Sequence, residues 1–195
     1  MINDKKITIG LSGGVGSFSE QATDYYCQQE GIKEYEKKYL ISVENVLTSL
    51  DNDEVDFGVF PIENSNGGVV YEAVYAMSEH LFKIEKFFEI DIKHCLIAKP
   101  GKNISDIKII TSHDQALKQC KMYLKRKWPN TEIKEWGDTA DAVRAVMEGE
   151  LSDNVAVIAS AKAAEIYSAE ILEEGVQDLK FNFTTFLAVK KIEKK

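Results

Sequence analysis

Short apolar, β-branched runs alternate with amphipathic stretches along nearly the whole chain. Apolar runs bounded by turn residues predict strands at 7–11, 39–41, 56–62, 107–111, 132–136, 155–159 and 184–189. Apolar residues recurring at helical spacing predict helices at 18–26, 43–50, 69–78, 114–127, 139–147 and 160–167. The β-branched stretch from Ile84 to Ala98 predicts a long extended segment. Such alternation is typical of α/β layers rather than of a helical bundle or a sandwich.

The chain is organised as two similar halves, because the pattern of strands and helices starts again after Pro100-Gly101. The extended segment before that point would carry the chain from one half to the other. We therefore expect two lobes, one formed by residues 1–92 together with a returning segment 178–195, and the other by residues 93–177.

Composition narrows the class of protein. With 44% hydrophobic and 29% charged residues the chain is ordinary globular material. No run approaches the ~18 to 20 apolar residues of a membrane span, and the polar start predicts a cytoplasmic protein without membrane contact. Three scattered cysteines give neither a disulfide framework nor a metal site. A net charge of −8 and the absence of a basic stripe argue against nucleic-acid binding.

Two loops stand where a predicted strand ends and a predicted helix begins, a frequent ligand position in α/β sheets. At Gly16-Ser17-Phe18 the glycine permits close approach of the backbone, and the exposed N–H groups of the helix start attract an anion. Asp138-Thr139-Ala140 offers a second helix start of the same kind. Ordinary helix capping is the commoner explanation of the first loop and explains the second equally well. Two such sites on opposing lobes would suit a dicarboxylate.

A third loop, Glu63-Asn64-Ser65, gathers an acid, an amide and a hydroxyl at a strand end, although a turn is a fair competing explanation. His113 beside Ser112 could act as a base, but no third member of a triad is identifiable. His94 before Cys95 is more often a satisfied core pair than a metal site. The glycine loop at 13–16 matches neither a phosphate loop nor a dinucleotide turn, so a nucleotide or redox enzyme has no motif behind it.

Taken together, the loops have the order and spacing of a known family. The chain resembles the catalytic domain of prephenate and arogenate dehydratases over essentially its whole length. The resemblance rests on Gly16-Ser17-Phe18-Ser19-Glu20, Pro61-Ile62-Glu63-Asn64-Ser65, His94-Cys95-Leu96, Ser112-His113-Asp114-Gln115-Ala116-Leu117-Lys118-Gln119-Cys120, Asp138-Thr139-Ala140, Ile158-Ala159-Ser160, Ala163-Ala164-Glu165-Ile166-Tyr167 and Asn182-Phe183-Thr184.

The resemblance implies a two-lobed α/β fold like that of type II periplasmic binding proteins, with the active site in the cleft between the lobes. It also implies a lyase of phenylalanine biosynthesis that converts prephenate to phenylpyruvate, or arogenate to phenylalanine, without a cofactor or metal. By the same resemblance the protein is a homodimer or homotetramer whose partner is a small-molecule substrate. We expect no regulatory ACT domain in this chain.

The resemblance further assigns roles to residues. Thr184 matches the threonine that helps the ring hydroxyl leave, and the polar cleft residues match Glu63, Asn64, Gln119 and Ser112. Substrate contacts are expected from the loops that hold the acid groups and from their neighbours, which are Ser17, Phe18, Ser65, Thr139, Ala140, Thr185 and Phe186.

The chain departs from the family pattern at three positions. The usual Thr-Arg-Phe appears as Thr184-Thr185-Phe186, so a cation such as Lys93 or Lys180 would have to replace the arginine. Asp114 stands where proline is frequent and Ser168 where glycine usually follows the tyrosine.

Two alternatives to a dehydratase stay open at this point. One is a prephenate decarboxylase that releases carbon dioxide without forming an aromatic ring, although the retained Thr184 and Gln119 argue against it. The other is a non-catalytic module that binds a small acid, since solute-binding proteins share the expected architecture.

Overall fold

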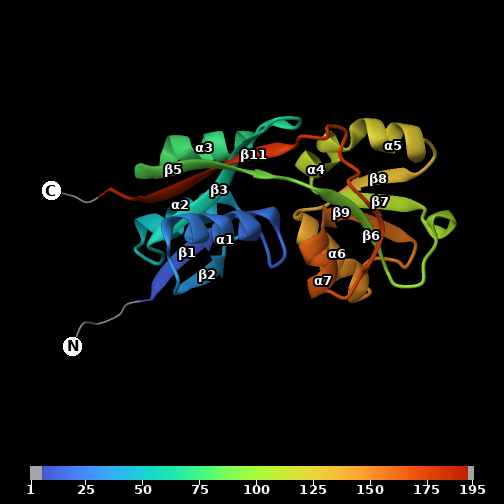
Figure 1. Cartoon of the computed structure of the whole chain (residues 1–195), viewed down its shortest axis with the longest axis horizontal. Coiled ribbons are helices and arrows are strands. Elements are labelled where there is room, and N and C mark those ends of the chain that lie inside the picture. Colours follow the sequence, from blue (N-terminus) through green and yellow to red (C-terminus); the bar gives the residue numbers. More distant parts are fainter. Residues whose placement is uncertain (1–5, 193–195) are drawn as a thin grey trace.

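The computed structural model describes residues 6–192 of the 195-residue chain. The described part forms two lobes side by side, each a β-sheet covered by helices (Figure 1). Residues 1–5 and 193–195, which belong to the expected first lobe, lie outside the described part. The type II binding-protein-like architecture expected from the sequence is confirmed at the level of two mixed α/β layers. Whether the lobes are separate units with the expected bounds stays a prediction.

The first lobe holds a six-stranded sheet. Its strands follow the order β2 (Tyr35–Tyr39), β1 (Ile7–Leu11), β3 (Phe57–Asn64), β11 (Phe183–Lys191) and β5 (Phe82–Asp91), and β4 (Gly68–Val69) pairs with β3. Its helices are α1 (Phe18–Glu30), α2 (Val43–Asp51) and α3 (Tyr71–Glu79). Strand β1 runs parallel to β2 and β3, whereas β11 runs antiparallel to β3 and β5.

The second lobe repeats this arrangement with five strands. Their order is β8 (Glu132–Glu135), β7 (Ile109–Ser112), β9 (Val155–Ser160), β6 (His94–Ala98) and β10 (Glu170–Glu174). The helices are a 3₁₀ turn at Ile104–Asp106, α4 (Asp114–Gln119), α5 (Lys121–Lys127), α6 (Thr139–Met147) and α7 (Ala161–Ile166). In both lobes three parallel strands are followed by one antiparallel strand that has just crossed from the other lobe.

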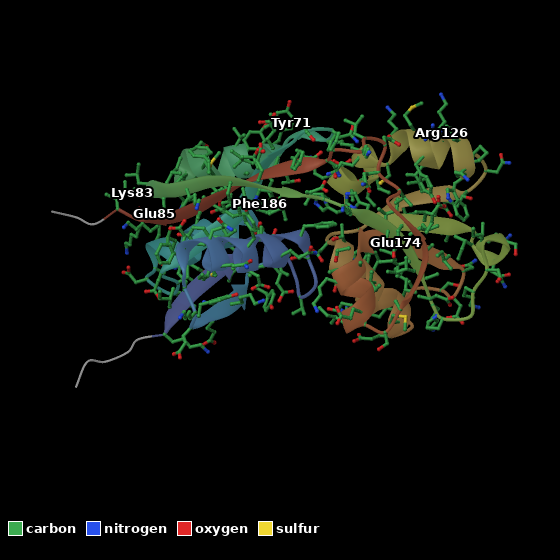
Figure 2. The ribbon with its side chains drawn as sticks, in the orientation of Figure 1. Tyr71, Lys83, Glu85, Arg126, Glu174 and Phe186 are labelled. Carbon is green, nitrogen blue, oxygen red and sulfur yellow. The ribbon has the colours of Figure 1, made fainter. Side chains whose placement is uncertain are left out.

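Apolar side chains cover both faces of each sheet. In the second lobe Leu96 and Ile158 pack toward α4 and α5, while their strand neighbours Ile97 and Val157 pack toward α6 and α7. In the first lobe Phe186 is fully buried on β11 (Figure 2). Burying a side chain of this size stabilises the fold by roughly 1.5–3 kcal/mol. The two apolar cores therefore hold the strands of each sheet in place.

The chain crosses between the lobes twice, once between β5 and β6 and once between β10 and β11. The crossings lie together, because Ile92 N–H donates to the backbone carbonyl of Asn182 at 2.7 Å. The expected return of the chain end to the first lobe is confirmed, since β11 lies between β3 and β5.

Most predicted strands and helices are present, with three corrections. The strand expected at 39–41 is wrong: β2 spans Tyr35–Tyr39, a charged edge strand in register with β1, and Ile41 follows in a turn with φ of 68°. The edge strands β4 and β10 were not expected. The helix expected over 114–127 is broken at Cys120, because the carbonyl of Gln119 accepts hydrogen bonds from Asn66 and from the amide of Asp178.

Candidate active site

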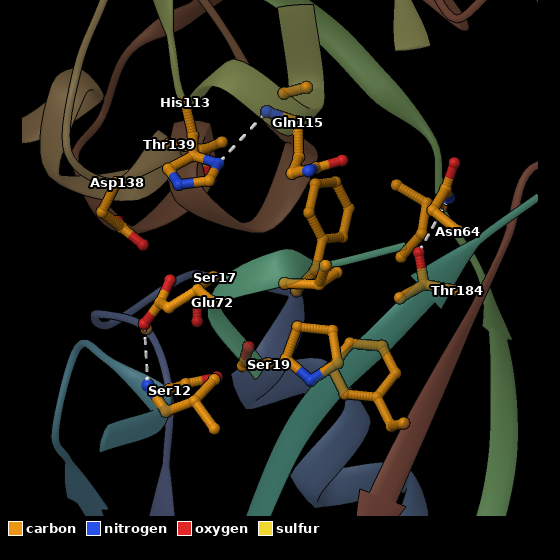
Figure 3. Close-up of a pocket in the computed structure, with 18 of the residues that line it drawn as sticks. Ser12, Ser17, Ser19, Asn64, Glu72, His113, Gln115, Asp138, Thr139 and Thr184 are labelled. Carbon is orange, nitrogen blue, oxygen red and sulfur yellow. Dashed lines mark hydrogen bonds between the residues drawn. The ribbon is translucent and has the colours of Figure 1, made fainter. Parts of the chain in front are cut away.

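A cavity of about 220 Å³ lies between the lobes, where loops from both sheets meet (Figure 3). Strand β1 continues into the glycine loop, defined here as Ser12 to Ser17, and β3 ends at Asn64. The second lobe contributes the starts of α4 and α6, and β11 contributes Thr184. Because the carboxyl ends of parallel strands are where α/β sheets bind ligands, this cavity is the candidate active site.

Thr184 and Asn64 form the best-defined polar pair in the cavity. They are register partners on β11 and β3, and both are buried. The Asn64 amide donates to Thr184 Oγ1 at 2.9 Å, while Asn64 Oδ1 accepts from the backbone N–H groups of Asn66 at 2.9 Å and Gly67 at 2.6 Å. Because backbone N–H groups can only donate, they fix which end of the amide faces Thr184. The hydroxyl proton of Thr184 is therefore available for another acceptor.

Gln119, at the end of α4, adds a side chain of the second lobe to the polar groups that line the cavity with Thr184 and Asn64. Its Oε1 lies 2.8 Å from His94 Nε2 and accepts from Asn182 Nδ2 at 2.8 Å. Complete burial lowers the pKa of His94 to about 4, despite the hydrogen bond to Gln119, so this imidazole is neutral at physiological pH. A neutral histidine can hydrogen-bond in the cavity but adds no positive charge there.

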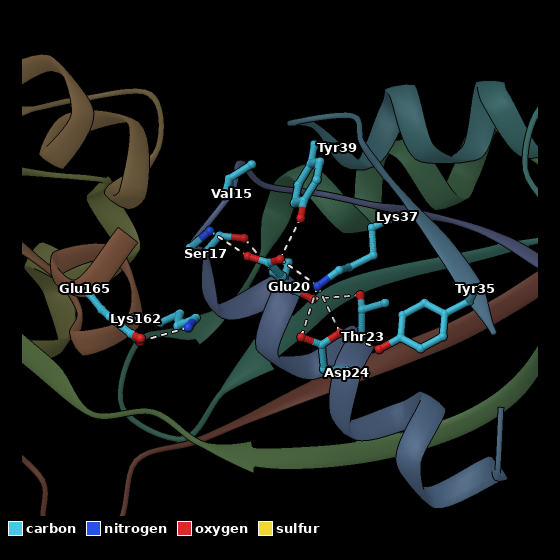
Figure 4. Close-up of polar contacts among 12 residues, drawn as sticks. Val15, Ser17, Glu20, Thr23, Asp24, Tyr35, Lys37, Tyr39, Lys162 and Glu165 are labelled. Atoms are coloured by element: carbon cyan, nitrogen blue, oxygen red, sulfur yellow. Dashed lines mark hydrogen bonds and ion pairs between the residues drawn. The ribbon is translucent and has the colours of Figure 1, made fainter. Parts of the chain in front are cut away.

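A cluster of charged and polar side chains around Glu20, in the first turn of α1, holds the glycine loop in place (Figure 4). Glu20 accepts hydrogen bonds from the Gly16 N–H, from Lys37 and from Tyr39, each at 2.6 Å. Burial alone would raise the pKa of Glu20, but these hydrogen bonds outweigh it and hold the pKa below its usual value. The loop also contacts the other lobe, because Ser160 Oγ donates to the carbonyl of Gly16 at 2.6 Å.

The two helix starts expected to bind anions differ in what they offer. At α6, the Asp138 carboxylate accepts from the N–H groups of Ala140 at 2.9 Å and Asp141 at 2.8 Å, so the chain caps these donors itself. At α1, Ser17 Oγ accepts from the Glu20 N–H at 3.2 Å. The first N–H groups of a helix have no intrahelical acceptor, so α1 can still present its first-turn amides to a ligand.

The titratable side chains on the described lining of the cavity are acids and histidines, with His113 among them. Among its described residues there is no lysine or arginine, whereas Glu72 and Asp138 are present. Lys93 is paired with Asp91 at 3.8 Å, and Lys180 lies over the ring of Phe181. Neither lysine lines the cavity, so neither stands in for the arginine that the sequence lacks. A bound anion would therefore depend on N–H and O–H donors.

Seven of the twelve residues expected at the site line this cavity: Thr184, Asn64, Gln119, Ser17, Phe18, Thr139 and Phe186. The other five do not. Ser112 is fully buried and donates to the carbonyl of Ile158, Ala140 packs in the core of the second lobe, and Ser65 accepts from the Phe183 N–H at 3.0 Å. Glu63 is exposed on β3. These four residues are not among those that line the cavity, and their expected roles stay predictions.

Thr185 faces away from the cavity because successive side chains of a strand point to opposite faces of the sheet. Thr184 and Phe186 line the cavity, and Thr185 between them donates to Glu89 Oε1 at 3.3 Å. Its register partners are Glu63 on β3 and Glu89 on β5. The expectation that the side chain at 185 binds substrate is therefore not supported by its direction.

Several polar residues at the site were not expected from the sequence. Asn182 is fully buried in the second crossing, and His94, weighed as a core residue against a metal ligand, lines the cavity. Glu72 also lines it and accepts from the Val43 N–H at 3.0 Å. The order of the motifs places Asn182 near Thr184, but only the fold shows that its side chain contacts both lobes.

Two general properties of the described chain complete the picture. Within residues 6–192 no three histidine, cysteine or acidic side chains are grouped so that they could hold a metal ion. In the same range no helix is long and apolar enough to cross a bilayer.

Comparison with known proteins gives concordant matches. The sequence model of the family described as "Prephenate dehydratase" matches residues 9–194. The chain is 32% identical over 188 residues to arogenate dehydratase/prephenate dehydratase 2 of Arabidopsis thaliana, covering 95% of this chain and 46% of that protein. The curated relatives that match nearly the whole chain are themselves roughly twice as long as it is. The chain therefore spans about half of their length.

Solved structures agree with this result. A prephenate dehydratase from Arthrobacter aurescens in complex with L-Phe superposes with a TM-score of 0.83 at 26% identity, covering 96% of this chain and 61% of that one. A putative methionine-binding lipoprotein from Bacillus subtilis has a TM-score of 0.55 at 13% identity, covering 96% and 84%, which shows a shared fold alone. Because the family model matches residues 9–194, nearly the whole chain, the chain belongs to the prephenate dehydratase family.

Proposed function

We propose that this chain catalyses the decarboxylating dehydration of prephenate to phenylpyruvate, with arogenate as the alternative substrate. The observation that carries the proposal is the Asn64 amide donating to Thr184 Oγ1 at 2.9 Å at the wall of the cavity. This contact leaves the threonine proton for the departing ring hydroxyl. The names of the relatives, which include both prephenate and arogenate dehydratases, support this choice of substrates.

The reaction needs little from the protein beyond positioning and one hydrogen bond. The bond from the ring to its carboxylate breaks and releases carbon dioxide, its electrons enter the ring, and the hydroxyl on the opposite ring carbon leaves. Formation of the aromatic ring drives both cleavages, and one proton from solvent completes the water. A neutral threonine is a weak acid, so its role is to donate a hydrogen bond to the leaving oxygen.

Substrate binding would depend on backbone and hydroxyl donors, because the lining has no lysine or arginine. The start of α1 beside the glycine loop offers N–H groups and the positive end of a helix dipole to one carboxylate. Glu72 and Asp138 on the same lining would favour a substrate that carries an ammonium group beside its side-chain carboxylate over one that carries a keto group there. Arogenate has such a group, and therefore both substrates belong in the test.

The test is to incubate the purified protein with prephenate or with arogenate and to identify the product by proton NMR. We expect aromatic ring protons from the favoured substrate. A product without aromatic protons would show a non-aromatising decarboxylase, and a raised melting temperature without turnover would show a binding module.

A pair of adjacent threonines supplies the matched variants. Thr184→Val removes the hydroxyl at nearly constant volume and should lower kcat about 10²- to 10³-fold, the usual loss for one well-placed donor. Thr185→Val removes the neighbouring hydroxyl, which faces Glu89 on the opposite side of the sheet, and should leave kcat within about threefold. Equal losses in both variants would contradict the role of Thr184.

The assembly state belongs to the same proposal. Exposed apolar side chains gather on and after α3, with Tyr71, Tyr75 and Leu81 each at least 67% exposed. We propose that a homodimer or homotetramer covers part of this surface, and light scattering of the purified chain measures its mass directly. The cytoplasmic location stays a prediction.

A further inference from the structure

Asn182 is a buried side chain that the proposed reaction does not use directly, and both the oxygen and the nitrogen of its amide are hydrogen-bonded. It lies two residues before Thr184, at the end of the second crossing, and is fully buried. Its Oδ1 accepts from Asn64 Nδ2 at 2.9 Å, and its Nδ2 donates to the Ile92 carbonyl at 3.1 Å and to Gln119 Oε1 at 2.8 Å. One side chain thus contacts both lobes and the first crossing.

The directions of these hydrogen bonds are fixed by the backbone. The Ile92 carbonyl can only accept, so the nitrogen of Asn182 must face it. The N–H groups of Asn66 and Gly67 can only donate, so the oxygen of Asn64 must face them. Given these two anchors, neither amide can rotate by 180° without breaking backbone hydrogen bonds.

The side-chain amides of Asn64, Asn182 and Gln119, called here the amide chain, are hydrogen-bonded in series, and their fixed directions have two consequences. Asn64 must present its nitrogen to Asn182, to Thr184 and to the Phe183 carbonyl, which share its two hydrogens, and Gln119 must present its oxygen to Asn182. The ring of His94 must therefore carry its proton on Nε2, which lies 2.8 Å from Gln119 Oε1. No partner for His94 Nδ1 is present in the described part of the chain.

We propose that Asn182 is a positioning residue: the backbone N–H groups of Asn66 and Gly67 set which end of Asn64 faces Thr184, and Asn182, by holding Asn64 and Gln119 at once, fixes where Asn64 and the Thr184 hydroxyl lie relative to the second lobe. This inference rests on the proposed function, because it concerns how that reaction is kept aligned. Asn182 does not touch the substrate and acts through Asn64. Its hydrogen bond to Gln119 makes the alignment depend on the second lobe.

The decisive variant is Asn182→Asp, which keeps the acceptor oxygen of the amide and replaces the donor nitrogen by a second oxygen. A carboxylate still accepts from Asn64 Nδ2 but cannot donate to Gln119 or to the Ile92 carbonyl. We expect kcat to fall about 10- to 100-fold at pH 8 with KM changed less than threefold. Burial raises the pKa of a carboxyl group, so part of the loss should be recovered as the pH falls and the protonated carboxyl donates again.

The other titratable groups near Asn182 should not mask the pH dependence of kcat expected for Asn182→Asp. The elements that contact Asn182 carry these titratable or charged groups: Glu63 on β3, Lys83, Glu85, Lys86, Glu89 and Asp91 on β5, Lys93 in the first crossing, His94 and Cys95 on β6, and Asp114 and Lys118 on α4. Burial lowers the pKa of His94 to about 4 and raises the pKa of Cys95, and the remaining groups are at least partly exposed. Asn182→Ala, which cannot donate at any pH, should show no recovery.

Thr111→Val controls for loss of a buried hydrogen bond alone. Thr111 is buried in the second lobe, donates to the Lys134 carbonyl at 3.0 Å and does not line the cavity. This variant should lose stability but keep kcat and its pH profile. If Asn182→Asp behaves like the control, or loses activity equally at every pH, then Asn182 has no positioning role.

A readout without turnover separates this inference from the proposed function. ¹⁵N NMR of the wild-type imidazoles should show His94 neutral between pH 5 and 8 with its proton on Nε2. A proton on Nδ1 would overturn the assigned hydrogen-bond directions even in a fully active enzyme. If the wild type converts neither prephenate nor arogenate, the proposed function fails, and the His94 spectra of the wild type and of Asn182→Asp still decide whether the amide chain is directed as described.

Discussion

Replacing Gly16 by alanine tests whether the contact between the glycine loop and the second lobe shapes the cavity. Gly16 has φ of +87°, a conformation that costs an L-residue about 1–2 kcal/mol. A Cβ there would lie 3.0 Å from the Cα of Ala163 in α7, an atom of the backbone that cannot turn aside. The loop must then move away from the second lobe.

That movement would weaken two hydrogen bonds of Gly16, from Ser160 to its carbonyl and from its N–H to Glu20, both 2.6 Å long. Weakening them should cost about 1–3 kcal/mol in addition to the backbone strain, since one partner is charged. The total expected loss is about 2–5 kcal/mol, within the stability of an ordinary domain.

Gly31→Ala is the matched control, because Gly31 has φ of +69° but no atom within 4 Å of an added Cβ. It should cost only the backbone strain of about 1–2 kcal/mol. Urea unfolding followed by circular dichroism measures both losses, and KM for the substrate should rise only for Gly16→Ala. If the two variants are equally destabilised and have equal KM, the contact between loop and lobe contributes nothing.

Three further variants test other parts of the account. Ser160→Ala removes the hydroxyl that caps α7 and donates to Gly16, so chemical denaturation should show a loss of about 1–2 kcal/mol. Glu20→Gln should remove a contribution that is complete above the unfolded-state pKa of about 4.5 and is lost as the pH falls through the depressed folded-state pKa; melting temperatures of wild type and variant should therefore converge on acidification, and a constant difference would contradict this reasoning. Thr185→Arg places a guanidinium beside Glu63 and Glu89, so it should change stability by no more than about 1 kcal/mol and kcat/KM by less than about threefold, whereas a gain of orders of magnitude would show that the side chain at 185 reaches the substrate.

The buried strands and the amphipathic helices could be predicted from the sequence because burial imposes a strong periodic pattern. The runs at Ile7–Leu11 and Val155–Ser160 and the helix at Thr139–Met147 are examples. The edge strands Tyr35–Tyr39 and Glu170–Glu174 could not be placed from the sequence, since they are largely charged and form because a neighbouring strand offers free backbone groups, whereas the edge strand Glu132–Glu135 was predicted.

The candidate site was predictable residue by residue only as far as the motifs reached. The placement of Thr184, Asn64 and Gln119 in one cavity agrees with the resemblance, but the direction of Thr185 depends on strand register, which a motif does not encode. The role of Asn182 depends on two crossings that meet, with its partners 118 and 63 residues away in the chain. Such long-range contacts leave no local pattern to read.

The hydroxyl group at position 184 is the centre of the account, and the turnover number of Thr184→Ser relative to Thr184→Val measures its contribution most directly. Serine keeps an O–H that can accept from Asn64 and donate to the leaving oxygen, whereas valine keeps only the shape. We predict that the serine enzyme retains kcat within about tenfold of wild type and exceeds the valine enzyme by at least about tenfold. Equal turnover by the two variants would contradict the claim that this hydroxyl assists the departure of the ring oxygen.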